Sequence, residues 1–295
     1  MSVIVLLTLT GLGLGALYFL VASGLSLIFG LMDVLNFAHG ALLSVGAYGT
    51  WWAASGNLPG AGPGGAGFVL AVAFGTAVGT VAAAVLELAL IRPLYARPRE
   101  QILATVGVSL AVPALLSAIW GADARTFPGP EALSGTFGLL GADVPVNRLV
   151  LIAAALLVLA ALKLFLRYTR YGLVVRAGVE DRTMVTALGI DVRRAFTLVF
   201  AIGGAAAALG GALGGLYFGS VDPGQGTSLL IFAFVVVVMG GMGSVSGAAL
   251  ASVGVGLVQE FANYYTTAGL GDLSVVVLLA ALLLLRPRGL TGRLA

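Results

Sequence analysis

Residues 1–32 read MSVIVLLTLTGLGLGALYFLVASGLSLIFGLM and contain no charged side chain. A segment of about 20 mostly apolar residues is long enough to cross the hydrocarbon core of a bilayer. The rest of the chain continues the pattern, because 60% of its 295 residues are hydrophobic and only 9% are charged. A soluble fold of this size needs a polar surface that such a composition cannot supply. The sequence therefore indicates an integral membrane protein.

Charges are so sparse that they divide the chain into apolar segments. Apart from His39, further runs without a charge are 34–86, 101–122, 149–162, 195–221, 223–259 and 273–285. Only helices and closed barrels satisfy their backbone hydrogen bonds in lipid. These runs are continuous and do not alternate with the two-residue period of a barrel strand. We therefore predict a single transmembrane domain over residues 1–295, an all-α polytopic bundle of eight to nine spans.

Lysine and arginine predict how the bundle is oriented. Thirteen of the fifteen fall into three groups, at 92–99, 163–194 and 286–293, and cytoplasmic loops carry an excess of these residues. The spans counted between the groups place all three on one side, with the N-terminus outside and the C-terminus inside. The segment near 121–148 has more acidic than basic residues and is predicted to be an external loop. The expected location is therefore a membrane that the chain crosses several times.

Two glycine-containing stretches are predicted to interrupt helices inside the membrane. The first, 30–40, reads GLMDVLNFAHG, and the second, 240–247, reads GGMGSVSG. Glycine is a poor helix former. Paired interrupted helices often border a solute path, because irregular backbone at membrane depth needs protein or water beside it. The glycines expected at these breaks are Gly30, Gly40, Gly240, Gly241, Gly243 and Gly247.

Four polar side chains in these breaks are candidates for a translocation path. They are Asn36, His39, Ser244 and Ser246. Polar groups at membrane depth usually face a cavity or a partner, and Asn36 and His39 could hydrogen-bond a zwitterionic solute. His39 could instead bond a backbone carbonyl, and the serines could serve only the packing of a kinked helix. Outside the breaks, Glu87 is expected to pair with Arg92 near the membrane surface.

One short string recurs in the two halves of the chain. Residues 14–19 read LGALYF and residues 213–218 read LGGLYF. Under the predicted topology these two segments run in opposite directions, as an inverted repeat requires. A second pair of similar strings runs in the same direction, so a duplication stays an open alternative to chance similarity in a chain rich in glycine and alanine.

The inventory of reactive side chains argues against an enzyme. The chain has no cysteine and a single histidine, so neither a thiol nucleophile nor a metal site with several Cys or His ligands is expected. No GxxxxGK[ST] phosphate-binding loop occurs, and Lys163 is the only lysine. The basic residues lie between apolar runs and not among interleaved aromatics, so nucleic acid is not an expected partner. If the protein works in an ATP-driven process, another polypeptide must hydrolyse the ATP.

Several short motifs occur in order along almost the whole chain. They are GLSLIFG at 24–30, NFAHG at 36–40, YG at 171–172, RA at 176–177, ALGID at 187–191, GGMGS at 240–244 and RPRGL at 286–290. Together they resemble the permeases of bacterial ATP-binding-cassette (ABC) importers for branched-chain amino acids. The expected external loop at 121–148 carries none of them.

The resemblance implies a multi-pass permease subunit of the bacterial inner membrane that binds no cofactor itself and translocates branched-chain or related amino acids. Its implied partners are a second homologous permease, two cytoplasmic ATPase subunits that hydrolyse ATP, and a periplasmic substrate-binding protein. Two alternatives stay open. One is a permease of the same family for urea or another small polar solute, and the other is a secondary transporter or channel that acts alone. The second is disfavoured because the span centres contain almost no acidic residues.

The resemblance also assigns the cytoplasmic loop near 167–194 to docking on an ATPase subunit. Residues 176–188 are expected to form a short helix, and Gly189 suits the left-handed position that follows a helix. The residues expected to couple ATP hydrolysis to transport are Arg176, Glu180, Asp181, Arg182, Ala187 and Gly189. An interfacial helix that lies on lipid headgroups is the alternative.

Overall fold

The computed structural model describes residues 2–32, 35–180, 184–185, 192–267, 269–287 and 289–291. Its helices are α1 (Ser2–Met32), α2 (His39–Trp52), α3 (Gly65–Leu86), α4 (Pro98–Trp120), α5 (Glu131–Ser134), α6 (Val146–Tyr168), α7 (Arg170–Glu180), α9 (Val192–Phe218), α10 (Gln225–Gly240), α11 (Val245–Tyr265) and α12 (Leu270–Leu285). A π-helical turn follows α2 at Ala53–Asn57, and another extends α3 over Glu87–Ile91, before a short 3-10 turn at Arg92–Leu94. The charge-free runs 101–122, 149–162, 195–221 and 273–285 each lie largely within one helix, whereas the runs 34–86 and 223–259 each contain two.

Helix length separates two kinds of segment. Within the described part of the chain, six helices are long and apolar enough to cross a membrane: α1, α3 with its continuation to Leu94, α4, α6, α9 and α11. Helices α10 and α12 are apolar but have 16 residues each, and α2 has 14. Sixteen residues span about 24 Å as a helix, less than the roughly 30 Å of the hydrocarbon core. The prediction of an all-α polytopic bundle with discontinuous helices is therefore confirmed.

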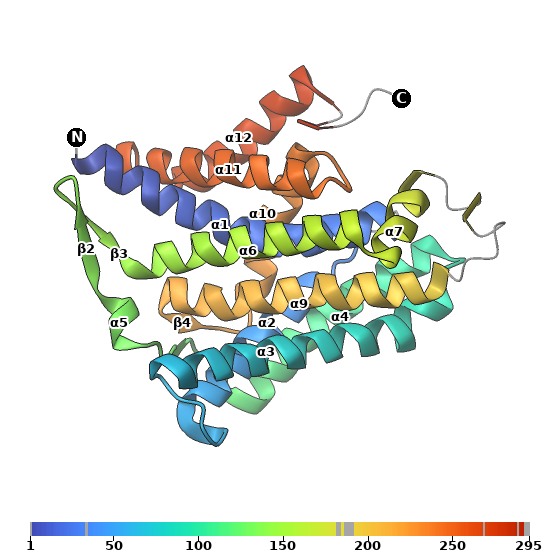
Figure 1. Cartoon of the computed structure of the whole chain (residues 1–295), viewed down its shortest axis with the longest axis horizontal. Coiled ribbons are helices and arrows are strands. Elements are labelled where there is room, and N and C mark those ends of the chain that lie inside the picture. Colours follow the sequence, from blue (N-terminus) through green and yellow to red (C-terminus); the bar gives the residue numbers. More distant parts are fainter. Residues whose placement is uncertain are drawn as a thin grey trace.

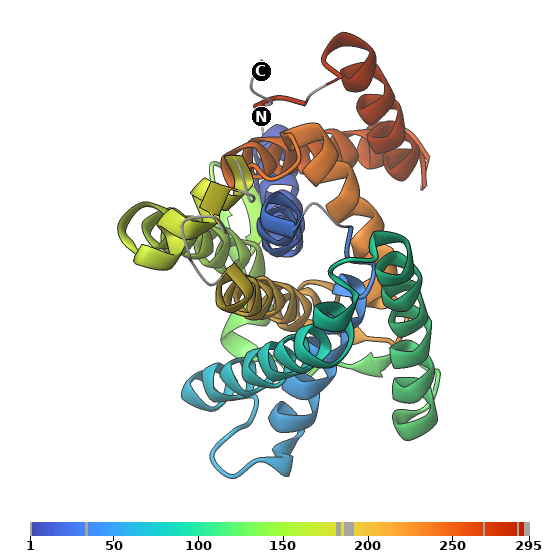
Figure 2. The ribbon, with the colours of Figure 1, turned by 90° about the vertical axis from the view of Figure 1, so that its right-hand side faces the viewer.

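Helix α1 is the centre of the bundle. It packs against α11, α9, α6 and α10, and the view along the helices in Figure 2 shows these elements arranged around it. Every residue from Leu14 to Ile28 is buried. An apolar sequence without an amphipathic stripe is what a helix surrounded by protein requires, which explains why this stretch carries no charge.

Small residues allow the central helices to approach each other closely. A Cβ built on Gly24 of α1 would lie 2.3 Å from the carbonyl oxygen of Gly203 in α9, and one on Gly15 would lie 2.6 Å from the carbonyl oxygen of Ser252 in α11. Without a hydrophobic driving force between helices in lipid, such van der Waals contact is a main source of association. The many glycines therefore allow close packing of helices within one subunit.

The end of the bundle that carries the N-terminus also carries the short strands. Strand β1 (Arg125–Thr126) pairs antiparallel with β4 (Ser220–Val221), and β2 (Thr136–Leu139) pairs with β3 (Ala142–Pro145) in a hairpin. The hairpin turn places Leu140 and Gly141 at φ of 51° and 79°, the left-handed values of a type I′ turn. Figure 1 shows these strands and α5 at the end opposite α7.

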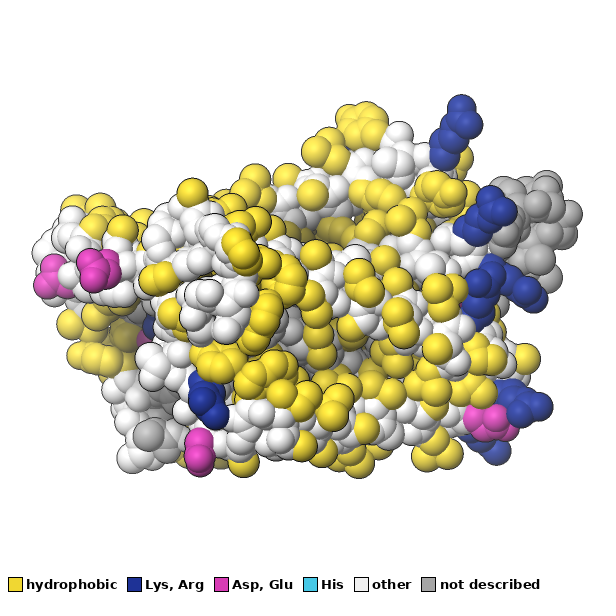
Figure 3. All heavy atoms as spheres, turned by 90° about the horizontal axis from the view of Figure 1, so that it is seen from below, with side chains coloured by type: hydrophobic (Ala, Val, Ile, Leu, Met, Phe, Trp, Pro, Cys, Tyr) yellow, Lys and Arg dark blue, Asp and Glu magenta, His cyan; other side chains and the backbone are white. Residues whose placement is uncertain are grey.

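The two ends of the bundle differ in charge. Figure 3 shows Lys and Arg side chains gathered at the end that carries α7, while Asp and Glu are prominent at the other end. The exposed cations at the first end include Arg92, Arg97, Arg99, Lys163, Arg167, Arg170 and Arg176. Between the two ends the surface is largely apolar, with leucines such as Leu103, Leu110 and Leu157 at least 70% exposed. This distribution is the one expected when lipid surrounds the middle and water covers the ends.

Candidate functional site

The two predicted helix breaks lie against each other. Helix α1 ends at Met32 and α2 begins at His39, while α10 ends at Gly240 and α11 begins at Val245. A Cβ on Gly30 would lie 2.9 Å from the Cα of Gly243, so the two breaks are in backbone contact. We call residues 30–40 and 240–247 the helix-break cluster; Asp33 lies outside the described residues.

The glycines of the second break have backbone angles and close contacts that residues with a Cβ would not allow. Gly241 and Gly243 have φ of 95° and 83°, a region that side chains with a Cβ rarely adopt. A Cβ on Gly247 would lie 2.0 Å from the carbonyl oxygen of Gly240. The C-terminal segment completes the contact, because Thr291 donates a hydrogen bond through its hydroxyl to the Gly240 oxygen at 2.7 Å. The motifs at 240–244 and 286–290 therefore belong to one packing unit.

The four predicted path residues occupy different environments in this cluster. His39 is fully buried, and its Nε2 donates to the carbonyl oxygen of Val21 in α1 at 3.0 Å. Asn36 is 3% exposed, and its Oδ1 accepts from the backbone N–H of Ala38 at 3.1 Å. Ser244 caps α11 by accepting from the Gly247 N–H at 3.0 Å, and Ser246 is exposed. Their role in a solute path stays a prediction.

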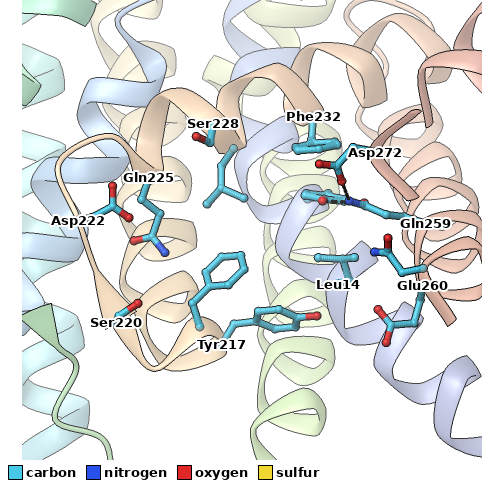
Figure 4. Close-up of a pocket in the computed structure, with 14 residues that line it drawn as sticks. Leu14, Tyr217, Ser220, Asp222, Gln225, Ser228, Phe232, Gln259, Glu260 and Asp272 are labelled. Atoms are coloured by element: carbon cyan, nitrogen blue, oxygen red, sulfur yellow. Dashed lines mark hydrogen bonds between the residues drawn. The ribbon is translucent and has the colours of Figure 1, made fainter. Parts of the chain in front are cut away.

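A cavity of about 530 Å³ lies between α1, α9, α10, α11 and α12 (Figure 4). Most of its lining side chains are polar: Tyr18, Tyr217, Ser220, Asp222, Gln225, Ser228, Gln259, Glu260, Asn263 and Asp272. Leu14, Phe218, Leu229 and Phe232 complete the lining. None of the four predicted path residues is among them. The cavity is the candidate functional site, and the sequence analysis did not foresee it.

The cavity has two polar walls. Figure 4 shows Asp222 and Gln225, from the start of α10 and the loop before it, on one side. Gln259 and Glu260 of α11 lie with Asp272 of α12 on the other. The three carboxylates therefore face one volume although they come from three separate segments. Glu260 is half-buried and lines the cavity.

Hydrogen bonds fix the orientation of one wall. The Tyr18 hydroxyl donates to Oε1 of Gln259 at 2.7 Å, and Nε2 of Gln259 donates to Oδ1 of Asp272, also at 2.7 Å. The Tyr18 ring is stacked on Phe232, with centroids 5.0 Å apart. Because the amide is held at both ends, Asp272 is positioned by α1 and α11 together, and its second oxygen is left for other donors.

An arginine lies behind the wall formed by Tyr217. The guanidinium of Arg148 in α6 is 3.5 Å from the centroid of the Tyr217 ring, and its Nη1 donates to the Tyr217 carbonyl oxygen at 3.2 Å. Such a cation over an aromatic face is held by electrostatic attraction to the ring. Arg148 is not one of the residues that line the cavity, so its charge acts on the site from behind.

The predicted coupling loop is described only in part. Helix α7 begins at Arg170 and ends at Glu180, earlier than the helix expected over 176–188. Arg176 is exposed on it, as a docking surface requires, whereas Val175 is 2% exposed. A Cβ on Gly178 would lie 2.9 Å from Leu31 at the end of α1. Asp181, Arg182, Ala187 and Gly189, together with the side chain of Glu180, lie outside the described residues.

The environment of Glu87 differs from the surface pair with Arg92 that we expected from the sequence. It is fully buried where α3 passes into the π-helical turn. The hydroxyl of Thr197 in α9 donates to its Oε2 at 2.8 Å, and the hydroxyl of Tyr95 donates to its Oε1. Arg92 is exposed, so the expected surface pair gives way to a buried link between α3 and the start of α9.

These features define a class of protein. A helical bundle with an apolar girdle, a cationic end and a polar cavity that opens to the surface is a polytopic membrane protein. The family described as branched-chain amino acid transport system / permease component matches residues 7–285. The chain therefore belongs to this family, and it is a multi-pass inner-membrane protein.

Individual relatives match over nearly the full chain. The high-affinity branched-chain amino acid transport system permease protein LivH of Escherichia coli K12 is 30% identical over 294 residues, which cover 96% of this chain and 94% of the relative. The permease protein BraD of Pseudomonas aeruginosa is 30% identical with the same coverage. A probable LivH of Methanocaldococcus jannaschii is 28% identical over 92% of this chain and 88% of its own. No match was found among solved structures.

Proposed function

We propose that this chain is the membrane subunit through which an ATP-driven importer passes branched-chain amino acids across the inner membrane. The observation that carries the proposal is the open cavity of about 530 Å³, which gathers ten polar side chains between helices of a bundle whose lipid-facing surface is apolar. Polar groups are costly in a membrane unless they serve a solute or a partner. The names of the relatives supply the solute class.

The mechanism that we propose is alternating access without covalent chemistry. Helix α1 links the two ends of the protein, because Leu31 contacts α7 while Leu14 and Tyr18 line the cavity. The thirteen helical steps from Tyr18 to Leu31 correspond to about 20 Å of helix. A displacement of α7 would therefore reach the cavity through one packed helix.

The partners belong to the same proposal. A second homologous permease would form the other half of the membrane unit, and a periplasmic substrate-binding protein would deliver the solute at the end that carries the strands. Two ATPase subunits would dock at the cationic end through residues 167–194 and hydrolyse the ATP. This assignment agrees with the lack of a GxxxxGK[ST] motif in the sequence.

Uptake by cells of the native host tests the proposed function. We expect a deletion of this gene to abolish uptake of labelled leucine at micromolar concentration, and re-expression of the chain to restore it. Excess isoleucine should compete, whereas urea and glutamate should not. Leucine uptake that survives the deletion, or competition by urea at equal concentration, would contradict the proposed solute class.

A bulky side chain at Gly189 tests the proposed docking loop. Gly189→Trp should uncouple the system, so that ATP hydrolysis by the purified complex continues while leucine uptake falls at least tenfold. Gly107→Trp is the matched control, because a Cβ at Gly107 meets nothing within 4 Å and the residue is exposed on α4, outside both proposed docking surfaces. Normal leucine uptake in the Gly189→Trp variant would exclude a tight contact at this position.

A further inference from the structure

The buried carboxylate of Glu87 is not explained by packing alone. Its side chain is fully buried, and within the described part of the chain it forms no salt bridge. A carboxylate removed from water is costly unless hydrogen bonds or a cation compensate it. An apolar side chain of similar volume could join the same helices without that cost. The carboxylate therefore indicates a contact that has to be polar.

Two hydroxyl groups from other segments compensate this carboxylate. Thr197, in the second turn of α9, donates to Oε2 at 2.8 Å, and Tyr95, which follows the 3-10 turn, donates to Oε1. The Tyr95 ring also meets the ring of Phe196 edge-on, with centroids 5.1 Å apart. Two adjacent residues of α9 are thus linked to Glu87, one directly and one through Tyr95.

The hydroxyl of Thr197 has a second acceptor within reach. The carbonyl oxygen of Arg193, four residues earlier in α9, lies 3.2 Å from Thr197 Oγ1. A hydroxyl carries a single proton, and threonine within a helix commonly donates it to the carbonyl four residues back. If α9 moves away from Glu87, Thr197 can therefore keep a hydrogen bond inside its own helix. The contact between Thr197 and Glu87 can open without leaving the hydroxyl unpaired.

The helices beside this contact have features that suit a small relative movement. Helices α3 and α9 run side by side (Figure 1) and meet through small residues, since a Cβ on Gly204 would overlap the Cβ of Ala83. Packed helices of this kind can slide by small amounts. At Glu87 the α-helix changes to a π-helical turn, in which the Arg92 N–H donates to the Glu87 carbonyl oxygen five residues earlier. Such turns occur frequently at functional sites.

We propose that Glu87 is a positioning residue for transport, which binds the start of α9 to α3 in one state of the transport cycle and releases it in the other. Helix α9 follows the predicted docking loop, and its far end contributes Tyr217 and Phe218 to the cavity. Movement at the loop would therefore reach the cavity through α9 as well as through α1. The proposal rests on the proposed function and deepens it, because it names the contact that changes during alternating access.

Chemical modification of Glu87 tests whether the contact opens. Dicyclohexylcarbodiimide is an apolar reagent that reacts with buried carboxyl groups, and mass spectrometry of the peptide that contains residue 87 measures the modified fraction. In the purified complex, we expect this fraction to differ at least threefold between the nucleotide-free form and the form trapped with ATP and vanadate. Equal fractions in the two forms would show a fixed contact and overturn the proposal.

Variants of Thr197 show whether its hydroxyl controls this reaction. Thr197→Val keeps the shape of the side chain without the hydroxyl, so modification of Glu87 should rise at least threefold, even in membranes that contain the permease without its partners. Thr197→Ser should restore the wild-type fraction. Thr80→Val is the matched control, because the Thr80 hydroxyl donates to the Thr76 carbonyl oxygen within α3 at 2.7 Å. It should leave the fraction unchanged. Equal modification in Thr197→Val and the wild type would overturn the proposal.

The ratio of leucine transported to ATP hydrolysed tests the role of the contact in transport. We expect Thr197→Val to lower this ratio at least fivefold per assembled complex, and Thr197→Ser to restore it, whereas Thr80→Val should not change it. A purely structural hydroxyl would instead alter the amount or the thermal stability of the complex and leave the ratio unchanged. That result would overturn the positioning role.

The outcomes separate this proposal from the proposed function. If the wild-type complex takes up no leucine, the proposed solute class fails, but nucleotide-dependent modification of Glu87 that is lost in Thr197→Val still supports a moving contact. Conversely, leucine uptake together with a modified fraction that is independent of nucleotide overturns the role of Glu87 and leaves the proposed function intact.

Discussion

The helix-break cluster and the cavity both interrupt the apolar bundle, but the cluster consists of closely packed backbone, whereas the cavity is lined by polar side chains. In the cluster, backbone fills the space: Gly30 lies against Gly243, and Gly247 against Gly240. In the cavity, side chains leave about 530 Å³ open and surround it with carboxylates and amides. Irregular backbone at membrane depth thus needs protein beside it here, and it need not mark the place where a solute binds.

The two regions are nevertheless neighbours. A Cβ on Gly226, the residue after Gln225, would lie 2.1 Å from the carbonyl oxygen of Gly40 at the start of α2. The first break therefore supports the cavity wall from behind. Under the proposed function, the cluster positions the short helices and the cavity takes the solute.

We expect the largest effect, a loss of assembled permease, from a substitution that adds a side chain inside the helix-break cluster. Gly247→Ala would bring a Cβ to 2.0 Å from the Gly240 oxygen, and overpacking costs about 1–3 kcal/mol or more. We expect the amount of assembled permease in the membrane to fall at least fivefold. Gly254→Ala in the same helix is the control, since its Cβ meets nothing within 4 Å and alanine favours a helix over glycine. Equal levels of the two variants would refute the tight packing.

A substitution at His39 tests which region carries the solute. His39 is fully buried and bonded to the Val21 oxygen, so we expect His39→Ala to lower the thermal stability of the purified complex, with a cost of about 1–3 kcal/mol for the unpaired carbonyl. Uptake of leucine per assembled complex should stay within twofold of the wild type. A selective loss of uptake with unchanged stability would instead place His39 in the solute path, which is one of the two roles that the sequence leaves open for it.

The sequence predicted the scaffold because its signals are local. Each span shows as a charge-free run, and the breaks show as glycines within a few residues of one another. The cationic end likewise follows from counting Lys and Arg. These properties depend on neighbours along the chain, so folding preserves them.

The cavity could not be predicted in this way, because its groups are distant in sequence. Tyr18 and Gln259, which share a hydrogen bond, are 241 residues apart. Asp222 and Asp272 each appear as an isolated charge next to an apolar run, which is also how a surface residue appears. Acidic residues are scarce in the span centres, but this observation does not reveal that three of the chain's acidic residues converge on the cavity. One signal was available: Tyr18 and Tyr217 occupy the same place in LGALYF and LGGLYF, and both line the cavity.

The smallest effect that we expect is the most specific to the cavity. Tyr18→Phe removes only the hydroxyl that fixes Gln259, and with it one buried hydrogen bond of 2.7 Å, worth about 0.5–1.5 kcal/mol. The freed amide can turn and release Asp272, so the maximal rate of leucine uptake per complex should fall about two- to tenfold. The half-saturating leucine concentration should not change, since a separate binding protein is proposed to capture the solute.

Tyr48→Phe provides the matched control for this variant. Tyr48 is 1% exposed, and its hydroxyl has no hydrogen-bond partner among the described residues, so its removal should leave uptake unchanged and stability equal or higher. If the two variants lower uptake equally, the effect of Tyr18→Phe reflects general packing of the bundle. A loss confined to Tyr18→Phe ties solute transfer to the orientation of Gln259 and Asp272, because both variants lose the same atom from a buried ring.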